Sequence, residues 1–188
     1  MSALPTKSDR FLVFNTMIDG PYAIKDFQKV VALLKLKLDD VVWFSGINEW
    51  VILSQAKVLS HPLPVASERR NYPRAPIDAT VTLHNSHGNV FYGRIRNISA
   101  GGSLISGLTR FNVGEEVRGV IRSGNFSHPI ACRARVLRID SGGEETLGCA
   151  IQFTDMEKVD QKAISHYCDQ VIQLASELVQ STKLKKPA

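Results

Sequence analysis

The chain has 188 residues, of which 44% are hydrophobic, and a formal net charge of +5. This composition is sufficient for a packed core and excludes an intrinsically disordered chain. No stretch approaches the roughly 20 apolar residues that span a bilayer, and the first ten residues lack the apolar run of a secretory signal. We therefore expect a soluble, cytoplasmic protein with one large domain or two small ones.

The pattern of the three cysteines also favours the reducing environment of the cytoplasm. Cys132, Cys149 and Cys168 are odd in number, widely spaced and set among apolar residues. This pattern matches neither a disulfide framework nor the ligand spacing of a metal site. We expect three reduced, buried thiols.

Residues 11–54 predict a small folded unit. Phe11–Phe14 has the composition of a short strand, and Asp19–Tyr22 has the composition of a turn. Apolar residues then recur at helical spacing from Ile24 to about Leu38. Val41–Trp50 follows as a predicted strand and tight turn, and it contains both tryptophans of the chain.

The order of these elements resembles the bacterial GYF-like domain. Gly20–Tyr22, the helix that follows it, and the spacing of Trp43, Gly46 and Trp50 carry the resemblance. The sequence departs from that family at Phe11–Phe14, where an aromatic pair that includes tryptophan is usual.

The GYF-like resemblance implies a protein-interaction domain at residues 1–55. Relatives of that fold bind proline-rich peptides on an aromatic patch, because such peptides already have the extended helix that they keep when bound. By resemblance, Tyr22, Trp43 and Trp50 are the candidate peptide-binding residues. The alternative is that both tryptophans form the core of a domain that has little else to bury.

Residues 56–67 predict a linker between two domains. This segment contains Pro62 and Pro64 and has no periodic apolar pattern. It leads directly into Arg69 and Arg70, so we expect a second domain at residues 68–188.

Six short strands are predicted in this second domain. They are separated by glycines and polar turns, which is typical of a small antiparallel barrel. The segment His84–Asn89 contains two histidines, and for it a hairpin turn with polar side chains is preferred over a metal site. The expected strands are 77–83, 90–98, 103–105, 116–122, 130–139 and 147–153.

A long helix is predicted from residue 155 to about residue 184. Its apolar residues are three and four apart and form one stripe. They are Ile164, Tyr167, Val171, Leu174 and Leu178. We expect the first half to pack on the barrel. A second copy of the chain is the candidate partner for the rest, although the heptads are too few to predict a coiled coil.

The predicted fold class is therefore α+β, with a small N-terminal domain followed by a six-stranded antiparallel barrel and a long C-terminal helix. Basic charge is concentrated in the barrel segment, since residues 61–154 carry 11 arginines, no lysine and 7 acidic residues. This excess suits an anionic ligand and equally permits nucleic acid. Charge alone does not separate the two.

Two short elements in this segment share one chemistry. Arg70 and Arg74 lie four residues apart, and Pro73 favours extended backbone between them, so both side chains project to one side. A guanidinium forks onto the O6/N7 edge of guanine, pairs with phosphate or stacks on a purine. Asn97 and Ser99 follow at alternate strand positions, and their side-chain oxygens can accept from guanine N–H groups.

Gly101 and Gly102 complete the second element. They remove side chains where a base must approach the backbone, and they permit a sharp turn. Taken separately, the first element would be solvated surface charge and the second an ordinary polar turn. Their combination and their separation make the pattern specific.

The combined pattern, R-x-x-x-R followed by N-x-S-x-x-G, resembles the signature of the PilZ domain, a receptor module for the bacterial second messenger cyclic di-GMP. Residues 147–153 also resemble the last PilZ strand. Asn97 stands where the family often has aspartate, which accepts hydrogen bonds more strongly. The resemblance implies cyclic di-GMP as the ligand, with no cofactor and no metal. The implied binding residues are Arg69, Arg70, Arg74, Asn97, Ser99, Gly101 and Gly102, of which Arg69 either extends the phosphate contacts or faces water.

The function predicted from the sequence is a non-enzymatic cyclic di-GMP effector. No nucleophile motif is present, and the acidic pairs fall in turns. We expect the nucleotide to order the arginine lead-in and so to change the interdomain arrangement or the binding of a protein partner through the N-terminal domain. The alternative is a scaffold without nucleotide binding that docks a proline-rich or membrane-associated partner. Nucleic-acid binding is not expected, because the arginines are scattered over strands and loops.

Overall fold

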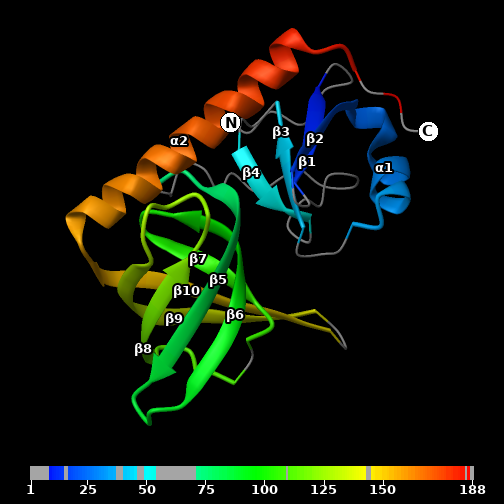
Figure 1. The fold of residues 1–188 in the computed structure, drawn as a ribbon. Coiled ribbons are helices and arrows are strands. Elements are labelled where there is room, and N and C mark those ends of the chain that lie inside the picture. Colours follow the sequence, from blue (N-terminus) through cyan, green and yellow to red (C-terminus); the bar gives the residue numbers. More distant parts are fainter. Residues whose placement is uncertain are drawn as a thin grey trace. The chain divides into compact units, whose positions relative to one another are not determined.

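The computed structural model describes residues 9–14, 17–36, 40–45, 49–53, 71–108, 110–142, 145–184 and 186. The chain divides into two compact units, the first of residues 1–70 and 170–188 and the second of residues 71–169. Figure 1 labels their strands and helices along the chain. The predicted linker at residues 56–67, together with Arg69, Arg70 and Gly46, lies outside the described residues.

The first unit is built on an antiparallel sheet whose described strands run in the order β2-β1-β3-β4. These strands are β1 (Arg10–Phe14), β2 (Ile18–Ala23), β3 (Val41–Phe44) and β4 (Glu49–Ile52). A 3-10 turn, η1 (Ile24–Asp26), leads into helix α1 (Phe27–Leu33). The helix is shorter than predicted because Lys35 adopts left-handed backbone with φ 50°, and its chain reversal ends the helix.

The predicted turn at Asp19–Tyr22 is wrong, since these residues belong to strand β2. Glycine and proline are typical of turns, but β2 lies at the edge of the described sheet. An edge strand has N–H groups without a neighbouring strand, so a proline there removes no required ladder bond. Asp19 accepts hydrogen bonds from the Gly20 N–H and the Tyr22 hydroxyl, each at 2.9 Å.

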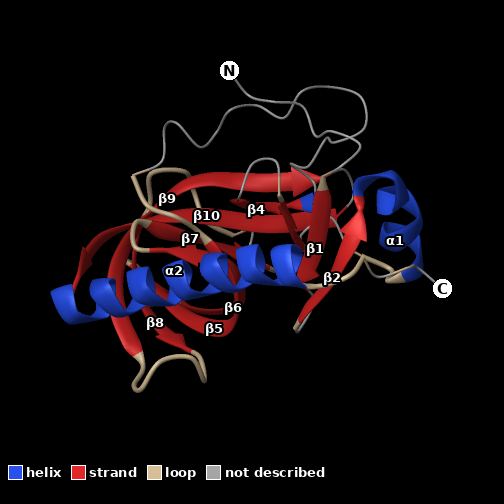
Figure 2. Cartoon of the chain, turned by 90° about the horizontal axis from the view of Figure 1, so that it is seen from above, coloured by secondary structure: helices blue, strands red, loops and turns tan. Residues whose placement is uncertain are grey.

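Successive residues of β1 and β3 point to opposite faces of this sheet, and each face has its own apolar cluster. One cluster contains Tyr22 and the rings of Phe11, Phe27 and Phe44 against α1. Figure 2 shows α1 beside β1 and β2. The first face is therefore closed by the short helix.

The opposite face is closed by the second half of helix α2 (Lys158–Ser181), which belongs to the same unit. Trp43 and Trp50 are directly paired across β3 and β4 and pack with Ala175 and Val179 of α2. The Arg10 guanidinium donates hydrogen bonds to backbone carbonyls near the end of this helix. Val171 and Leu178 of the predicted stripe thus pack within the chain, whereas Leu174 is exposed. Pairing of this half with a second copy stays an untested prediction.

The three candidate peptide-binding residues do not share a surface. Tyr22 lies in the cluster against α1, whereas Trp43 and Trp50 lie in the cluster against α2. Their exposed fractions are 3%, 2% and 1%. This arrangement agrees with the alternative that the tryptophans form the core, and peptide binding by these side chains stays an untested prediction.

The second unit is a closed antiparallel barrel, in which the described strands run in the order β10-β7-β6-β5-β8-β9. The strands are β5 (Ala75–Asn85), β6 (Val90–Ser99), β7 (Gly102–Ser106), β8 (Glu116–Arg122), β9 (Ile130–Gly142) and β10 (Glu145–Met156). This confirms the predicted six-stranded barrel, with strands that extend further than the apolar alternation indicated. The hairpin turn after His84 is also confirmed, since Asn85 Oδ1 accepts from the N–H groups of His87 and Asn89.

The three cysteines are free and buried, as predicted. Burial raises the pKa of Cys132 to about 11 and that of Cys168 to about 12. Both thiols therefore stay protonated at neutral pH. In the described part of the chain, no helix is long and apolar enough to cross a membrane.

The contact between α2 and the tryptophan pair can be tested with Ala175→Glu. Ala175 is fully buried, so a carboxylate there would be surrounded by apolar side chains. We expect the free energy of unfolding to fall by about 3 kcal/mol or more. Both tryptophans of the chain lie in this cluster, so their fluorescence emission should shift to longer wavelength.

Gln170→Glu is the matched control for this substitution. Gln170 is exposed on the same helix, and the change adds the same charge with the same good helix former. We expect its emission and stability to match those of the unchanged chain. An equal loss in both variants would contradict the packing of Ala175 against the tryptophans.

Candidate functional site

The two arginine- and asparagine-containing elements meet at one end of the barrel. Strand β5 begins directly after Arg74, and its first residues pair with β6, with Ala75 opposite Ile98 and Pro76 opposite Asn97. Arg74 is half-buried and adjoins the end of β6. The structure thus brings Arg74 beside Asn97 and Ser99, while Arg70 and Arg69 lie outside the described residues.

Tyr72 joins the first element to the turn of the second. A Cβ atom at Gly101 would lie 2.8 Å from Tyr72 Cδ2, so the ring covers the glycine. Tyr72 remains 41% exposed. Sequence reasoning missed this residue, and the available signal was an aromatic side chain between two basic residues and next to a proline.

Ser99 stabilises the β6–β7 turn. Its hydroxyl accepts from the Gly101 N–H at 3.3 Å and donates to the Gly102 carbonyl at 3.2 Å. Because a hydroxyl has one donor and two acceptor positions, only one acceptor is left for a ligand. The side chain is 4% exposed. Its main role in this structure is to hold the turn that follows Asn97.

The side-chain oxygen of Asn97 is buried without a hydrogen-bond partner among the described residues. Asn97 is 3% exposed, and its Oδ1 atom accepts no hydrogen bond from any residue that the structure describes. An unsatisfied buried acceptor costs about 1–3 kcal/mol. The second element therefore holds an unused acceptor at its first position.

Gly102 is required by the close approach of another strand. It pairs with Gln152 of β10, and a Cβ atom at Gly102 would lie only 2.2 Å from the Ile151 carbonyl oxygen. Neither Gly101 nor Gly102 has a positive φ. The β6–β7 turn falls at Ala100 and Gly101, as expected, but its backbone conformation does not itself require glycine, and the requirement at Gly102 is steric.

The first half of α2 holds the backbone around this site. The Tyr167 hydroxyl donates to the Pro76 carbonyl at 2.7 Å, and the Cys168 thiol donates to the Ile98 carbonyl at 3.3 Å. Gln161 Nε2 donates to the Ala100 carbonyl at 3.4 Å. Burial raises the pKa of Tyr167, so its hydroxyl stays protonated and able to donate. The apolar stripe predicted the packing of this half of the helix but not these three hydrogen bonds.

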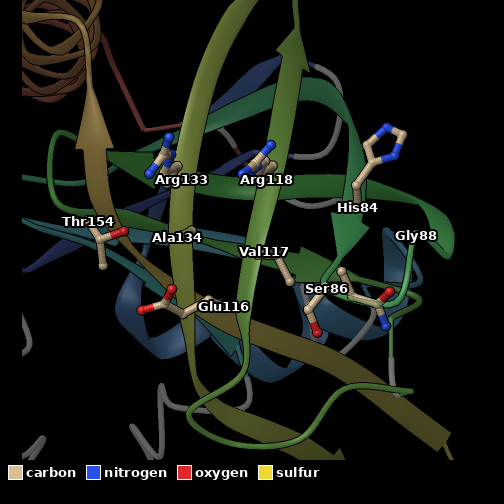
Figure 3. Close-up of a pocket in the computed structure, with 10 residues that line it drawn as sticks. His84, Ser86, Gly88, Glu116, Val117, Arg118, Arg133, Ala134 and Thr154 are labelled. Atoms are coloured by element: carbon tan, nitrogen blue, oxygen red, sulfur yellow. The ribbon is translucent and has the colours of Figure 1, made fainter.

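A separate pocket lies at the other end of β5. It has a volume of about 530 Å³ and is lined by side chains around His84, Glu116, Arg118 and Arg133 (Figure 3). It contains none of the residues predicted to bind cyclic di-GMP. In the residues that the structure describes, no three metal-ligating side chains gather at one point.

The sequence of the barrel segment matches a known family. The profile of the PilZ domain family matches residues 68–170, which is more than half of the chain. The chain belongs to the PilZ domain family. The match begins at the arginine-containing lead-in and ends within α2, so it does not bear on the GYF-like resemblance of residues 1–55, which stays a prediction.

Solved structures share the fold of this PilZ protein. Escherichia coli YcgR in complex with c-di-GMP is similar at a TM-score of 0.53 and 13% identity, over 96% of this chain and 91% of that chain. Because this match covers nearly the whole chain, it includes the first unit as well as the barrel.

Two further structures are similar at lower TM-scores. Bacillus subtilis MotI/DgrA, an inhibitor of motility, has a TM-score of 0.49 and 21% identity, over 89% of this chain and 97% of that chain. K. pneumonia MrkH in its apo state has a TM-score of 0.48 and 14% identity, over 91% and 90%. No curated protein matches the chain.

The steric role of Gly102 can be tested with Gly102→Ala. The new Cβ atom would overlap a backbone carbonyl that cannot rotate away, so we expect the free energy of unfolding to fall by about 3 kcal/mol. Urea denaturation measures this loss. Gly124→Ala is the control, because a Cβ atom there meets nothing within 4 Å and its φ is not positive. Equal stabilities of the two variants would contradict the contact with β10.

Proposed function

We propose that the chain is a non-enzymatic receptor for cyclic di-GMP, bound where the first residues of β5 meet the end of β6. The observation that carries the proposal is the buried, unpartnered Oδ1 atom of Asn97 at the first position of the second signature element. Membership of the PilZ family supports it, as does the fold shared with YcgR, whose structure contains c-di-GMP.

The chemistry of this site matches the ligand. Guanine presents N–H donors on one edge, and Asn97 Oδ1 can accept from them without breaking an existing hydrogen bond. Arg70 and Arg74 supply guanidinium groups for the phosphates and for the O6/N7 edge of guanine. Arg69 extends this lead-in. The Tyr72 ring lies over Gly101, so in this structure an aromatic side chain fills the space beside that glycine. A purine face can stack on such a ring.

The effect of the ligand passes through α2 in this proposal. The first half of the helix donates hydrogen bonds to the carbonyls of Pro76, Ile98 and Ala100, which flank the proposed site. The second half contributes Ala175 and Val179 to the core of the first unit. A ligand that favours one arrangement of this backbone shifts the helix between states, and with it the first unit and any protein partner that binds there.

Isothermal titration calorimetry with cyclic di-GMP tests the binding site. We expect Arg70→Ala and Arg74→Ala each to weaken binding by about 1.5–3 kcal/mol, as for a charge-assisted hydrogen bond. Asn97→Ala should weaken binding as well, but it should leave the free energy of unfolding within about 1 kcal/mol, because it also removes an unsatisfied acceptor. Arg122→Ala, an exposed arginine on β8, is the control and should bind normally.

The outcome that contradicts this site is specific. Absence of heat at tens of micromolar nucleotide, or unchanged binding by Arg74→Ala, would leave the scaffold without nucleotide binding as the better description. Normal binding by Asn97→Ala would remove the role of its Oδ1 atom, even if the arginines were confirmed.

Tryptophan fluorescence tests the coupling to the first unit. Trp43 and Trp50 belong to the first unit, and residues 71–169 contain no tryptophan. We expect cyclic di-GMP to change their emission in the unchanged chain and not in Arg74→Ala. Binding that is detected by calorimetry without any change in emission would contradict the coupling through α2 while leaving the receptor function intact.

A further inference from the structure

A row of basic side chains crosses the outer face of the barrel. His84 of β5 lies directly opposite Arg118 of β8, and Arg118 lies directly opposite Arg133 of β9. Directly opposite residues share a face of the sheet, and all three side chains are exposed. Figure 3 shows the guanidinium groups of Arg118 and Arg133 projecting to the same side. Like charges in this position destabilise a sheet, so the pair needs compensation.

Neighbouring acidic side chains neutralise little of the positive charge of Arg118 and Arg133. Asp155 on β10 lies 3.8 Å from Arg133 Nε, and both side chains are more than 60% exposed, so this ion pair is weak. Glu116 Oε1 forms an ion pair with Arg135 Nη2 at 3.1 Å, and not with Arg118 or Arg133. The Arg118 side chain has neither an ion pair nor a hydrogen bond with any described residue. The row therefore retains positive charge that an anion can neutralise.

The row borders the pocket of about 530 Å³. In Figure 3, Ser86 and Glu116 lie across the pocket from the two arginines. Thr154 of β10 lies at one side, next to Ala134. The pocket is thus basic on one side and carries hydroxyl and carboxylate groups on the other. Its volume lies within the range of small-molecule sites, about 300–1,000 Å³.

We propose that this pocket is a second ligand site, which binds a small organic phosphate of about mononucleotide size. Arg118 and Arg133 hold the phosphate, since two planar guanidinium groups fork onto its oxygens. The Glu116 carboxylate would repel a second anionic group but accepts hydrogen bonds from hydroxyl or amino groups of the ligand. A free phosphate would use only the basic side and leave most of the volume empty.

This site is distinct from the proposed cyclic di-GMP site. Pro76, beside Asn97, and His84, at the pocket, lie eight residues apart on the same strand. At about 3.4 Å per residue they are roughly 27 Å apart, which exceeds the length of one mononucleotide. The two sites can therefore be altered separately.

Titration of the isotope-labelled full chain with adenosine 5′-monophosphate, followed by NMR, tests the proposal. We expect chemical-shift changes at the amides near His84, Arg118 and Arg133, and tighter binding than with inorganic phosphate. Adenosine, which lacks the phosphate, should not bind. Arg118→Gln and Arg133→Gln should each weaken binding by about tenfold or more, as expected for a lost charge-assisted contact.

Arg122→Gln is the matched control, since Arg122 is exposed four residues further along the same strand and does not line this pocket. It should bind adenosine 5′-monophosphate normally. Equal weakening by Arg122→Gln would show general attraction to surface charge and overturn the proposal. It is also overturned if the nucleotide does not bind at millimolar concentration, if adenosine binds equally well, or if the shifts gather around Arg74 and Asn97. Arg133→Gln keeps the test decisive should Arg118→Gln not fold.

Discussion

The contact between Gly102 and the backbone of β10 is the constraint on which the site depends. Because Gly102 has no Cβ atom, β7 can approach the Ile151 carbonyl of β10 closely enough to close the barrel. The Phe153 N–H then donates to the Gly101 carbonyl at 3.0 Å, which fixes the turn from the other side. The turn that carries Ser99 is therefore held by strand β10, by the Tyr72 ring and by its own hydroxyl.

A turn held in this way can keep a polar group unsatisfied. Asn97 lies between β5 and β7 in the sheet, so its backbone cannot move to find a partner for the Oδ1 atom. The stabilising contacts of the surrounding packing offset the unfavourable free energy of this buried acceptor. A ligand that satisfies the acceptor recovers this free energy without first having to order the side chain, which is the physical meaning of a preorganised site.

The sequence predicted those features that depend on local patterns. The strands of the barrel follow from alternation. The proximity of Arg74 to Asn97 and Ser99 follows from their places in one hairpin, while their binding roles stay predictions. The steric role of Gly102 depends on a strand about fifty residues later, and the Arg118–Arg133 pair depends on register, which no local pattern specifies. Strand β2 was missed because proline is excluded from central strands but not from an edge.

Helix α2 makes the stability of the two units interdependent. Its first half places Ile164 and Cys168, both fully buried, in the second unit, and its second half places Ala175 and Val179 in the first. The sheet of the first unit has apolar side chains on both faces, and α1 packs on only one of them. Unfolding of the helix would expose the tryptophan pair and remove the donors to the carbonyls around Asn97 in one step. Because helix formation is cooperative along the chain, loss of either half weakens the other.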